Sequence, residues 1–313
     1  MLVAVTGGTG FIGRALVDLH VMHGDQVRIL SRKQHDFSLL DAITLFEGDL
    51  ISSVDLLGQF VDGVDILYHC AGEILDQEKM YPVHVTGTKN LCVAAFGKIG
   101  HWVQLSSVGV YGHQVSGIVT EETPLNPIGT YEITKTKSDQ IVMSASKENA
   151  FSCSILRPSN VYGTDMSNQS LFQMIAMINK GLFFFIGRPG ASANYIHVDN
   201  VAEALMLCGY APASRGNVFN LSDRLTLEAF VTVIADELGC PIPTLRLPER
   251  PIRCLSRVFE SIRGFPLTAS RINAMTTRNV YIIDKIQNEL GYAHRIPIEE
   301  GVRQLVRIWK QSR

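Results

Sequence analysis

The chain has 313 residues, of which 46% are hydrophobic and 19% are charged, and its formal net charge at pH 7 is −2. This length suffices for one large core or two fused domains, and the near-neutral charge argues against electrostatic binding of nucleic acid or a membrane surface. No stretch is apolar for long enough to cross a bilayer, so we expect no membrane insertion.

The beginning of the chain and the cysteines indicate the cell compartment. "MLVAVTGG" has no basic segment and leads into a glycine loop instead of a cleavage site, so we expect no secretory signal. The six cysteines, at positions 70, 92, 153, 208, 240 and 254, form no C-x-x-C pair. We therefore expect reduced, mostly buried thiols, no metal site and a cytoplasmic location.

The first predicted strand runs into a glycine loop. "VAVTGGTGFIG" (3–13) contains Gly8-x-Gly10-x-x-Gly13 and an overlapping Gly7-x-x-Gly10-x-x-Gly13, followed by a helical pattern. Such a loop lets a pyrophosphate approach the free N–H groups at the helix N-terminus. The candidate cofactor-binding residues here are Gly7, Gly10, Phe11, Ile12 and Gly13. The alternative is a tight turn with a structural role only.

The second predicted strand ends in "VRILSRKQ". A site for NAD places an acidic residue at this point, where it bonds to the ribose hydroxyl. This chain has Ser31 there, followed by Arg32, and a guanidinium without a neighbouring carboxylate suits a 2′-phosphate. The pattern predicts a preference for NADP(H) and leaves NAD open; the alternative is an ordinary surface arginine.

Short apolar runs alternate with helix-length segments through the first half of the chain. The runs occupy residues 2–6, 26–30, 43–48, 65–71, 101–107 and 151–158. This alternation predicts an α/β fold, a Rossmann-type doubly wound parallel sheet with helices on both faces. We expect a dinucleotide-binding domain over 1–160.

After residue 160 the loops lengthen and prolines become frequent. We expect a smaller α/β substrate region over 161–313, with 193–210 open to packing back on the first domain. "GLFFFIG" (181–187) is interpreted as a buried strand.

"TYEITK" (130–135) places Tyr131 four residues before Lys135, which puts both side chains on one face of a helix. The pair alone is compatible with two solvated side chains. Seven pieces of the sequence, taken together and in order, resemble the extended short-chain dehydrogenase/reductase family, also called the NAD-dependent epimerase/dehydratase family. They are "TGGTGFIG" (6–13), "GDL" (48–50), "YHCAG" (68–72), "SSVGVYG" (106–112), "YEITK" (131–135), "LRPSNVYG" (156–163) and "YIHVDNVAEA" (195–204).

The resemblance covers nearly the whole chain and implies a catalytic set of Ser107, Tyr131 and Lys135. Hydride transfer to a carbon that bears oxygen requires a proton to move on that oxygen, which a tyrosine within hydrogen-bond reach supplies. An ammonium nearby is expected to lower the pKa of the phenol. The same resemblance assigns Tyr131 and Lys135 to the cofactor as well, and Ser107 to the substrate.

Further residues take their roles from the resemblance alone. Asp49 and Leu50 are expected to flank the adenine, His69, Cys70 and Ala71 to line the cofactor cleft, and Asn160 to contact the substrate. His197 and Asp199 are given no catalytic role.

The sequence also departs from the family pattern. His84 replaces an asparagine, and Ala193 stands where many sugar-nucleotide epimerases have an arginine. Arg188, Arg271 and Arg278 are candidates to replace that arginine.

The leading functional hypothesis is an NADPH-dependent reductase of a keto-sugar linked to a nucleotide. The alternatives are a nucleotide-sugar epimerase with bound NAD, a reductase of a steroid-like or flavonoid-like ketone, and a non-catalytic NADP-binding protein. We expect a small-molecule partner and no nucleic acid, and the helical segments 79–97 and 131–149 are expected to form a homodimer interface as in relatives.

Overall fold

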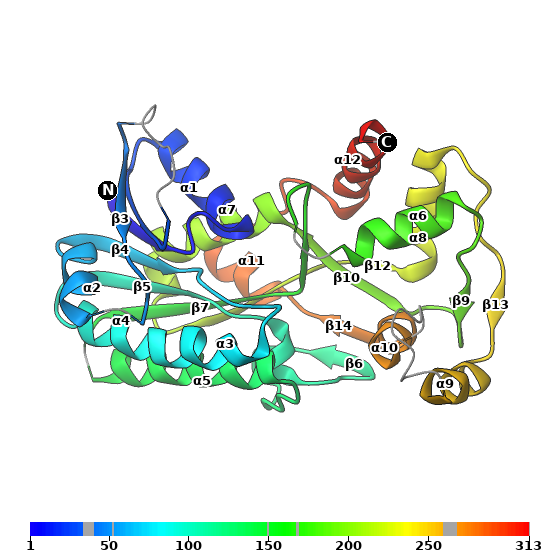
Figure 1. Cartoon of the computed structure of the whole chain (residues 1–313), viewed down its shortest axis with the longest axis horizontal. Helices are drawn as coiled ribbons and strands as arrows, with labels where there is room; N and C mark the ends of the chain where they lie inside the picture. The colour runs from blue at the N-terminus through cyan, green and yellow to red at the C-terminus, as the bar shows by residue number, and fades with distance from the viewer. Residues whose placement is uncertain (34–40, 52, 149, 167–168, 259–267, 313) are drawn as a thin grey trace.

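The computed structural model describes residues 1–33, 41–51, 53–148, 150–166, 169–258 and 268–312. Its centre is a seven-stranded parallel sheet with the strand order β11-β7-β5-β4-β1-β2-β3 (Figure 1). The strands are β1 (Leu2–Thr6), β2 (Gln26–Ser31), β3 (Ile43–Glu47), β4 (Val64–His69), β5 (Ile99–Leu105), β7 (Ser152–Pro158) and β11 (Val218–Leu221). The chain winds outward from β1 to β3 and then returns to β4 on the other side, so the strand order reverses between β1 and β4. The predicted α/β, doubly wound class is confirmed, and each of the six predicted apolar runs coincides with a strand of this sheet.

Both faces of the sheet are covered by helices (Figure 1). One face packs against α1 (Phe11–His23), α7 (Val198–Tyr210) and α11 (Asp284–Leu290), and the other against α2 (Val54–Phe60), α4 (Gly87–Ala95) and α5 (Thr130–Lys147). Side chains alternate between the faces, so Val3 and Val5 lie in the first core and Ala4 in the second. The nearly continuous apolar strands follow from burial on both sides.

The helix that ends with α4 changes its hydrogen-bond pattern along its length. Residues of α3 (Gln77–Tyr81) continue through a π-helical segment, η1 (Pro82–Thr86), directly into α4. A short 3₁₀ turn, η2 (Val108–Tyr111), follows β5, and another, η3 (Pro212–Ser214), follows α7. Both η1 and η2 lie next to the residues of the candidate site, where π-bulges and turns often occur.

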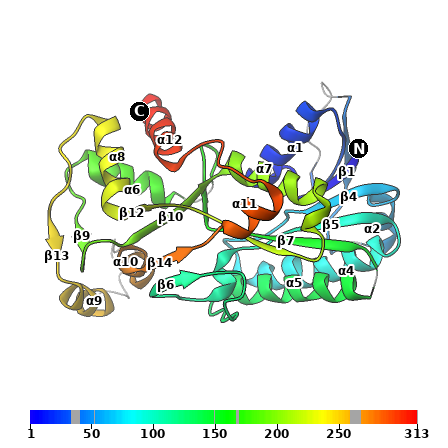
Figure 2. The ribbon, with the colours of Figure 1, turned by 180° about the vertical axis from the view of Figure 1, so that it is seen from behind.

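The second region, the predicted substrate region, is built from small sheets (Figure 2). Its buried apolar residues form a third core. Its sheets are β12 (Asp223–Thr226) with β10 (Ser192–His197) and β8 (Asn160–Tyr162), β13 (Arg246–Leu247) with β9 (Phe185–Ile186), and β14 (Arg278–Tyr281) with β6 (Ser116–Val119). Its helices are α6 (Ser170–Asn179), α8 (Leu227–Leu238), α9 (Glu249–Val258), α10 (Ala269–Thr276) and α12 (Ile298–Gln311). Apolar residues of α6, α8 and α12 form its core, including Phe230 and Trp309.

The interpretation of 181–187 as a strand is wrong for most of that run. Only Phe185 and Ile186 form a strand, β9, while Leu182 is 57% exposed. Phe183 and Phe184 pack partly against neighbouring cores. The aromatic side chains therefore contribute burial without the extended pairing that the run predicts.

The first sheet extends beyond the first 160 residues. β11 pairs with β7, and α7 packs along α1 in the core of the first sheet. The division at residue 160, with 193–210 packing back on the first domain, stays a prediction. Residues 198–210 and 218–221 lie with the first sheet, whereas Ser192–His197 form β10, which pairs with β12 and β8.

All six cysteines are free: Cys92, Cys153 and Cys208 are buried, Cys70 and Cys240 are partly buried, and Cys254 is exposed. Within the described ranges no helix is both long and apolar enough to span a bilayer.

Candidate active site

The glycine loop joins β1 to α1 in a shape that only small residues permit. Gly7 has a φ of +71°, and a Cβ on it would lie 2.7 Å from the backbone nitrogen of Ala71. A Cβ on Gly13 would lie 2.1 Å from the carbonyl oxygen of Gly7. Gly10 is the N-cap of α1 and no side chain caps the helix there, so its first N–H groups have no side-chain acceptor. This is a backbone cradle suited to a phosphate group.

Phe11 and Ile12, which follow the cradle, anchor α1 in two different cores. Ile12 packs against the core of the first sheet and Phe11 against the core of the second region. Both side chains are partly exposed, and their packing fixes the start of α1.

Ser31 and Arg32 stand at the end of β2. The Ser31 hydroxyl donates to the carbonyl of Lys33 at 2.8 Å and accepts from the Lys33 N–H at 3.2 Å. Ser31 is buried in this turn, while Arg32 is exposed. The described chain stops at Lys33 and resumes at Asp41.

Three of the predicted cofactor contacts lie at or just after the ends of β3 and β4: Asp49, Leu50 and His69. Leu50 is 5% exposed and lies in the core under α4, and Asp49 accepts from the N–H of Ile51 at 3.3 Å. His69 is 1% exposed, with Nδ1 2.6 Å from Thr6 Oγ1 and Nε2 3.0 Å from Thr88 Oγ1. Both side chains are directed inward, so the predicted cleft contacts of Leu50 and His69 are limited to backbone atoms.

Cys70 and Ala71 lie beside the glycine loop. The Cys70 N–H donates to the Thr6 carbonyl at 3.1 Å, and the Ala71 N–H donates to Thr6 Oγ1 at 3.3 Å. Burial raises the pKa of the Cys70 thiol to about 12, so the thiol is neutral at physiological pH. The ends of β1 and β4 therefore meet where the strand order reverses, which is the usual ligand position in doubly wound sheets.

Ser107, Tyr131 and Lys135 come from the end of β5 and the start of α5. Lys135 is 4% exposed, and its Nζ donates to the carbonyl of Leu105, two residues before Ser107. Ser107 is the N-cap of η2, and its Oγ accepts from the N–H of Gly109 at 3.1 Å. A Cβ on Gly109 would lie 3.0 Å from Glu132 Cγ, so the turn after Ser107 touches the first turn of α5, which carries Tyr131.

Burial dominates the acidity of Tyr131. Its pKa is raised to about 12 by burial and further by the negative charges of Glu132 and Asp139. The lowering expected from Lys135 together with a bound oxidised nicotinamide stays a prediction. Burial also lowers the pKa of Lys135, while Asp139 and Cys70 oppose that shift. The phenol is protonated at neutral pH.

His84, the departure from the family pattern, is a fixed neutral group beside Tyr131. Its Nε2 accepts from the N–H of Glu73 at 2.9 Å, so Nδ1 carries the proton and donates to Thr134 Oγ1 at 2.8 Å. Burial and the charge of Lys135 lower its pKa to about 3. Its ring meets the Tyr131 ring edge-on, with centroids 5.6 Å apart. His84 thus ties the loop after β4 to the start of α5.

Asn160, which we expect to contact the substrate, is exposed, and its Nδ2 donates to the carbonyl of Asn194 at 3.1 Å. Ala193 is 3% exposed and belongs to the core of the second region. His197 caps α7 by accepting from the N–H of Asp199 at 3.2 Å, a structural role.

The three candidate arginines are placed differently. Arg278 donates to the carbonyls of Pro189, Thr276 and Arg188, at 3.2 and 2.7 Å for the first two. Arg271 donates to Gln173, and Arg188 is exposed. Arg278 therefore closes a loop instead of facing a ligand.

Sequence reasoning did not single out two buried charged residues behind the site. Asp139 lies one helical turn after Lys135 on α5, and Arg157 lies on β7 with an Nη2 3.5 Å from Asp139 Oδ2. The four-residue step from Lys135 to Asp139 was the available signal. Within the described part of the chain, no three His, Cys, Asp or Glu side chains are grouped as a metal site would require.

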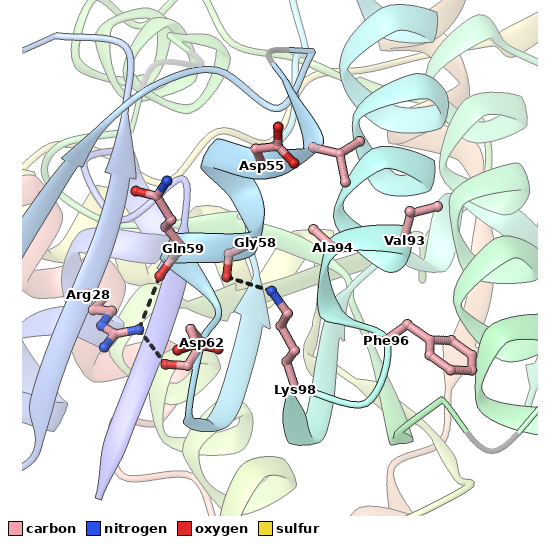
Figure 3. Close-up of a pocket in the computed structure, with 10 residues that line it drawn as sticks. Arg28, Asp55, Gly58, Gln59, Asp62, Val93, Ala94, Phe96 and Lys98 are labelled. Carbon is pink, nitrogen blue, oxygen red and sulfur yellow. Dashed lines mark hydrogen bonds between the residues drawn. The ribbon is translucent and has the colours of Figure 1, made fainter.

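A hollow of about 590 Å³ lies elsewhere, between α2 and α4 (Figure 3). These helices end at Phe60 and Ala95, just before β4 and β5 begin, so the hollow lies at the amino edge of the sheet, opposite the glycine loop. The two cationic side chains that line the hollow already donate to backbone carbonyls. Arg28 donates to the carbonyl of Asp62 at 2.7 Å, and Lys98 donates to that of Gly58 at 3.3 Å. They bind the carbonyls at the end of α2, which is a structural role.

The chain is similar to several known proteins. The model of the NAD dependent epimerase/dehydratase family matches residues 3–222. A 4-hydroxy-2-methyl-3-oxo-4-farnesyl-3,4-dihydroquinoline-1-oxide ketoreductase from Stigmatella aurantiaca is 26% identical over 95% of this chain and 93% of its own. A 2-alkyl-3-oxoalkanoate reductase from Stenotrophomonas maltophilia is 26% identical over 97% of this chain and 98% of its own.

Solved structures share the fold. The crystal structure of gox2253 is similar with a TM-score of 0.80 and 27% identity, over 99% of this chain and 98% of that one. A UDP-glucose 4-epimerase from Thermotoga maritima, solved with UDP-glucose, has a TM-score of 0.77 and 18% identity, over 100% of this chain and 99% of that one. At that identity the second likeness concerns the fold alone.

Proposed function

Because the chain belongs to the NAD dependent epimerase/dehydratase family, and is an NAD(P)-dependent oxidoreductase or epimerase of the extended short-chain dehydrogenase/reductase type, we propose that it reduces a ketone to a secondary alcohol. The observation that carries the proposal is the placement of Tyr131 one helical turn before the buried Lys135 on α5, with Ser107 at the end of β5. A protonated phenol is an acid, which is what reduction of a carbonyl requires.

The proposed roles follow from the positions of the three side chains. The bound reduced nicotinamide would supply the hydride that goes to the carbonyl carbon. The Ser107 hydroxyl holds the carbonyl oxygen, and the Tyr131 hydroxyl gives it a proton. The ammonium of Lys135 then stabilises the phenolate until it regains a proton from solvent.

The residues of the cradle fit a dinucleotide. The proposed contacts are the backbone of Gly7, Gly10, Phe11, Ile12 and Gly13 for the pyrophosphate, Asp49 and the backbone of Leu50 for the adenine, and the loop His69–Ala71 for the nicotinamide half. The support is steric: a Cβ on Gly7 or Gly13 would collide with backbone atoms that shape the cradle. We further propose NADP(H) as the preferred form, because Arg32 is exposed next to Ser31 and no carboxylate stands there.

For the substrate, we favour a ketone with a large apolar part over a nucleotide sugar. The relatives that are 25–26% identical over nearly the whole chain carry the names of reductases and hydroxysteroid dehydrogenases of such compounds. The buried Ala193 and the occupied Arg278 leave fewer cations for a diphosphate. This reverses the order of the two substrate classes in the sequence-based hypothesis.

A nucleotide sugar remains the second candidate, as a substrate of reduction or of epimerisation. Asn160 and Arg188 are both exposed and match polar recognition of a phosphate. An epimerase would return the hydride and consume no cofactor, which separates it from a reductase in a single assay.

The test is a substrate panel with the purified protein and NADPH. It contains a 2-alkyl-3-oxoalkanoate, a steroid ketone and 4-keto sugars linked to UDP and dTDP, with cofactor oxidation and product both measured. We expect oxidation with the apolar ketones, and none with the Tyr131→Phe variant as control. Reduction of the keto sugars alone would move the proposal to the second candidate, and an epimer formed without cofactor consumption would overturn reduction.

Two further expectations belong to this proposal. A homodimer through α4 and α5 is supported by Val93 and Phe96, which are 65% and 60% exposed at the end of α4. A cytoplasmic location is supported by the six free cysteines.

A further inference from the structure

Three charged side chains lie buried in a row behind the candidate active site. Lys135 and Arg157 are each 4% exposed and Asp139 is 1% exposed. Removing charges from water is unfavourable unless they are paired and hydrogen-bonded. Lys135 is already placed in the proposed reaction, which raises the question of what Asp139 and Arg157 do.

Asp139 holds the end of β5. Its Oδ2 accepts from the Ser106 hydroxyl at 2.6 Å and lies 3.5 Å from Arg157 Nη2. Its Oδ1 is buried and has no hydrogen-bond partner among the described residues. One of the two carboxylate oxygens is therefore buried without a hydrogen-bond donor among the described residues.

Arg157 contacts the end of η2, the turn that follows β5. Its Nη1 donates to the Tyr111 hydroxyl at 3.0 Å, and its guanidinium lies 5.1 Å from the centre of the Tyr111 ring. The Tyr111 hydroxyl in turn donates to Asn220 Oδ1 at 2.8 Å. Tyr111 is the last residue of η2, the turn that Ser107 caps.

Three successive residues at the end of β5 are thus held by one face of α5 and by the turn that follows. Lys135 binds the carbonyl of Leu105, Asp139 binds the hydroxyl of Ser106, and the Ser107 Oγ is held by Gly109. The step from Lys135 to Asp139 is one helical turn, which places the two side chains next to each other.

The groups that face Lys135 come from three elements. Asp139 faces it from α5, His69 and Cys70 from the end of β4, and His84 from η1, while Tyr131 lies one helical turn before it on α5. The pKa values of His69 and His84 are lowered to about 3, and those of Cys70 and Tyr131 are raised to about 12. All four are neutral at physiological pH.

Asp139 is faced by Lys135, by Arg157 from β7 and by Ser106 from β5. Burial raises the pKa of Asp139, and the two cations and the hydroxyl oppose that shift. Two cations against one carboxylate favour the ionised form. Asp139 is the carboxyl group among those that face Lys135, and its charge raises the pKa of Lys135 against the lowering by burial.

We propose that Asp139 is a positioning residue for the reaction: it keeps Lys135 as an ammonium and, through Ser106, fixes the strand end that carries Ser107, while Arg157 balances its charge. The role rests on the proposed function, because Lys135 and Ser107 matter only if the site reduces a carbonyl. The protonation state of Lys135, however, is a property of the protein alone.

The test is a titration of Lys135 by NMR in protein labelled at the lysine side chains, without cofactor or substrate. The signal is assigned by its loss in Lys135→Arg. Asp139→Asn keeps the size of the side chain and an acceptor for Ser106 but removes the charge, so the pKa of Lys135 falls. Arg157→Gln removes a cation from the row, so the pKa of Lys135 rises. Opposite shifts in two variants cannot come from a general loosening of the fold.

Activity supplies the second readout. In Asp139→Asn we expect kcat to fall at least about ten-fold at neutral pH with KM nearly unchanged, and part of the loss to be recovered at lower pH, where Lys135 regains its proton. Ser106→Ala lowers kcat without moving the titration of Lys135, because the charge remains. Asp18→Asn, an exposed carboxylate on α1, is the matched control and changes neither quantity.

An unchanged titration of Lys135 in Asp139→Asn would overturn the proposal. If that variant does not fold, a titration in Arg157→Gln that is unchanged or shifted downward overturns it equally. If the wild type reduces no ketone, the proposed function fails while the titration still decides the relation between Asp139 and Lys135.

Discussion

Tyr131 is a side chain at which burial and charge compete. Its ring packs edge-on against His84, and burial raises its pKa to about 12 although Lys135 lies one helical turn away. The phenol must give its proton during reduction and be restored before the next turnover. Its hydroxyl is therefore the reactive group, and its ring contributes packing.

We predict that Tyr131→Phe lowers kcat by about two to four orders of magnitude, the range typical of a removed acid–base group. The affinity for NADPH changes little, because the ring and its contact with His84 remain. Steady-state kinetics and a fluorescence titration with NADPH measure the two effects. Turnover close to that of the wild type would contradict the assignment of Tyr131.

Ser31 and Arg32 are the residues from which we expect the preference between NADP(H) and NAD(H) to come. A carboxylate at position 31 would repel a 2′-phosphate, whereas the exposed Arg32 offers a planar fork that binds one. Such charge-assisted bonds contribute about 1.5–3 kcal/mol, or about one to two orders of magnitude in affinity.

We predict that the protein binds NADPH more tightly than NADH, and that Ser31→Asp combined with Arg32→Ala reverses the order. Calorimetric titration with both dinucleotides measures this preference. Arg14→Ala, an exposed arginine on α1, is the control and keeps the wild-type order. Equal affinities of the wild type for the two cofactors would remove the case for NADP(H).

At the scale of elements, the glycine loop shows which glycines the fold requires. Gly13 lies inside α1, where alanine normally stabilises a helix by about 1 kcal/mol relative to glycine. Here the Cβ would lie 2.1 Å from the Gly7 carbonyl oxygen, whereas on Gly10 it would lie 3.2 Å from the same atom. The first contact requires the loop to move, and the second only a small adjustment.

We predict that Gly13→Ala destabilises the protein and abolishes dinucleotide binding, whereas Gly10→Ala leaves the free energy of unfolding nearly unchanged. Urea denaturation of both variants gives the comparison. If Gly13→Ala were as stable as the wild type, the close approach of α1 to the loop would not describe the protein in solution.

At the scale of the whole molecule, buried histidines make stability depend on pH, and three of them have strongly lowered pKa values. Burial lowers the pKa of His69 and His84 to about 3 and that of His101 to about 4, from a usual value of 6.5. Below pH 6.5 the unfolded chain binds protons at these positions and the folded protein does not. Stability is therefore fully present above pH 6.5 and is lost progressively as the pH falls toward the folded pKa values.

We predict a loss of up to about 1.4 kcal/mol per pH unit for each histidine once the pH is well below 6.5. Over two units the three histidines together approach the whole stability of an ordinary domain, about 5–15 kcal/mol. Urea denaturation at pH 7, 6 and 5 measures the slope, which His101→Gln reduces and which His113→Asn, at an exposed histidine, leaves unchanged. A free energy of unfolding that is the same at pH 7 and 5 would contradict the neutral buried state.

The sequence by itself determined six of the seven strands of the sheet, the glycine loop and the spacing of Tyr131 and Lys135. These signals are local: apolar runs of strand length, glycines that permit a turn, and a four-residue step on a helix depend on neighbours in the chain. The family resemblance added Ser107, whose motif "SSVGVYG" (106–112) is also a contiguous stretch of the chain. The aromatic run at 181–187 is the local signal that misled, because burial alone does not require a strand.

The tertiary structure alone decided which way side chains point and which charges meet. His69 and Leu50 turn inward, Arg278 binds backbone carbonyls, and Asp139 meets Arg157 and Ser106. The acidity of Tyr131 likewise depends on burial, to which the residues beside it in the sequence contribute only part. Burial and charge pairing are sums over residues far apart in the chain, and only the folded arrangement brings those residues together.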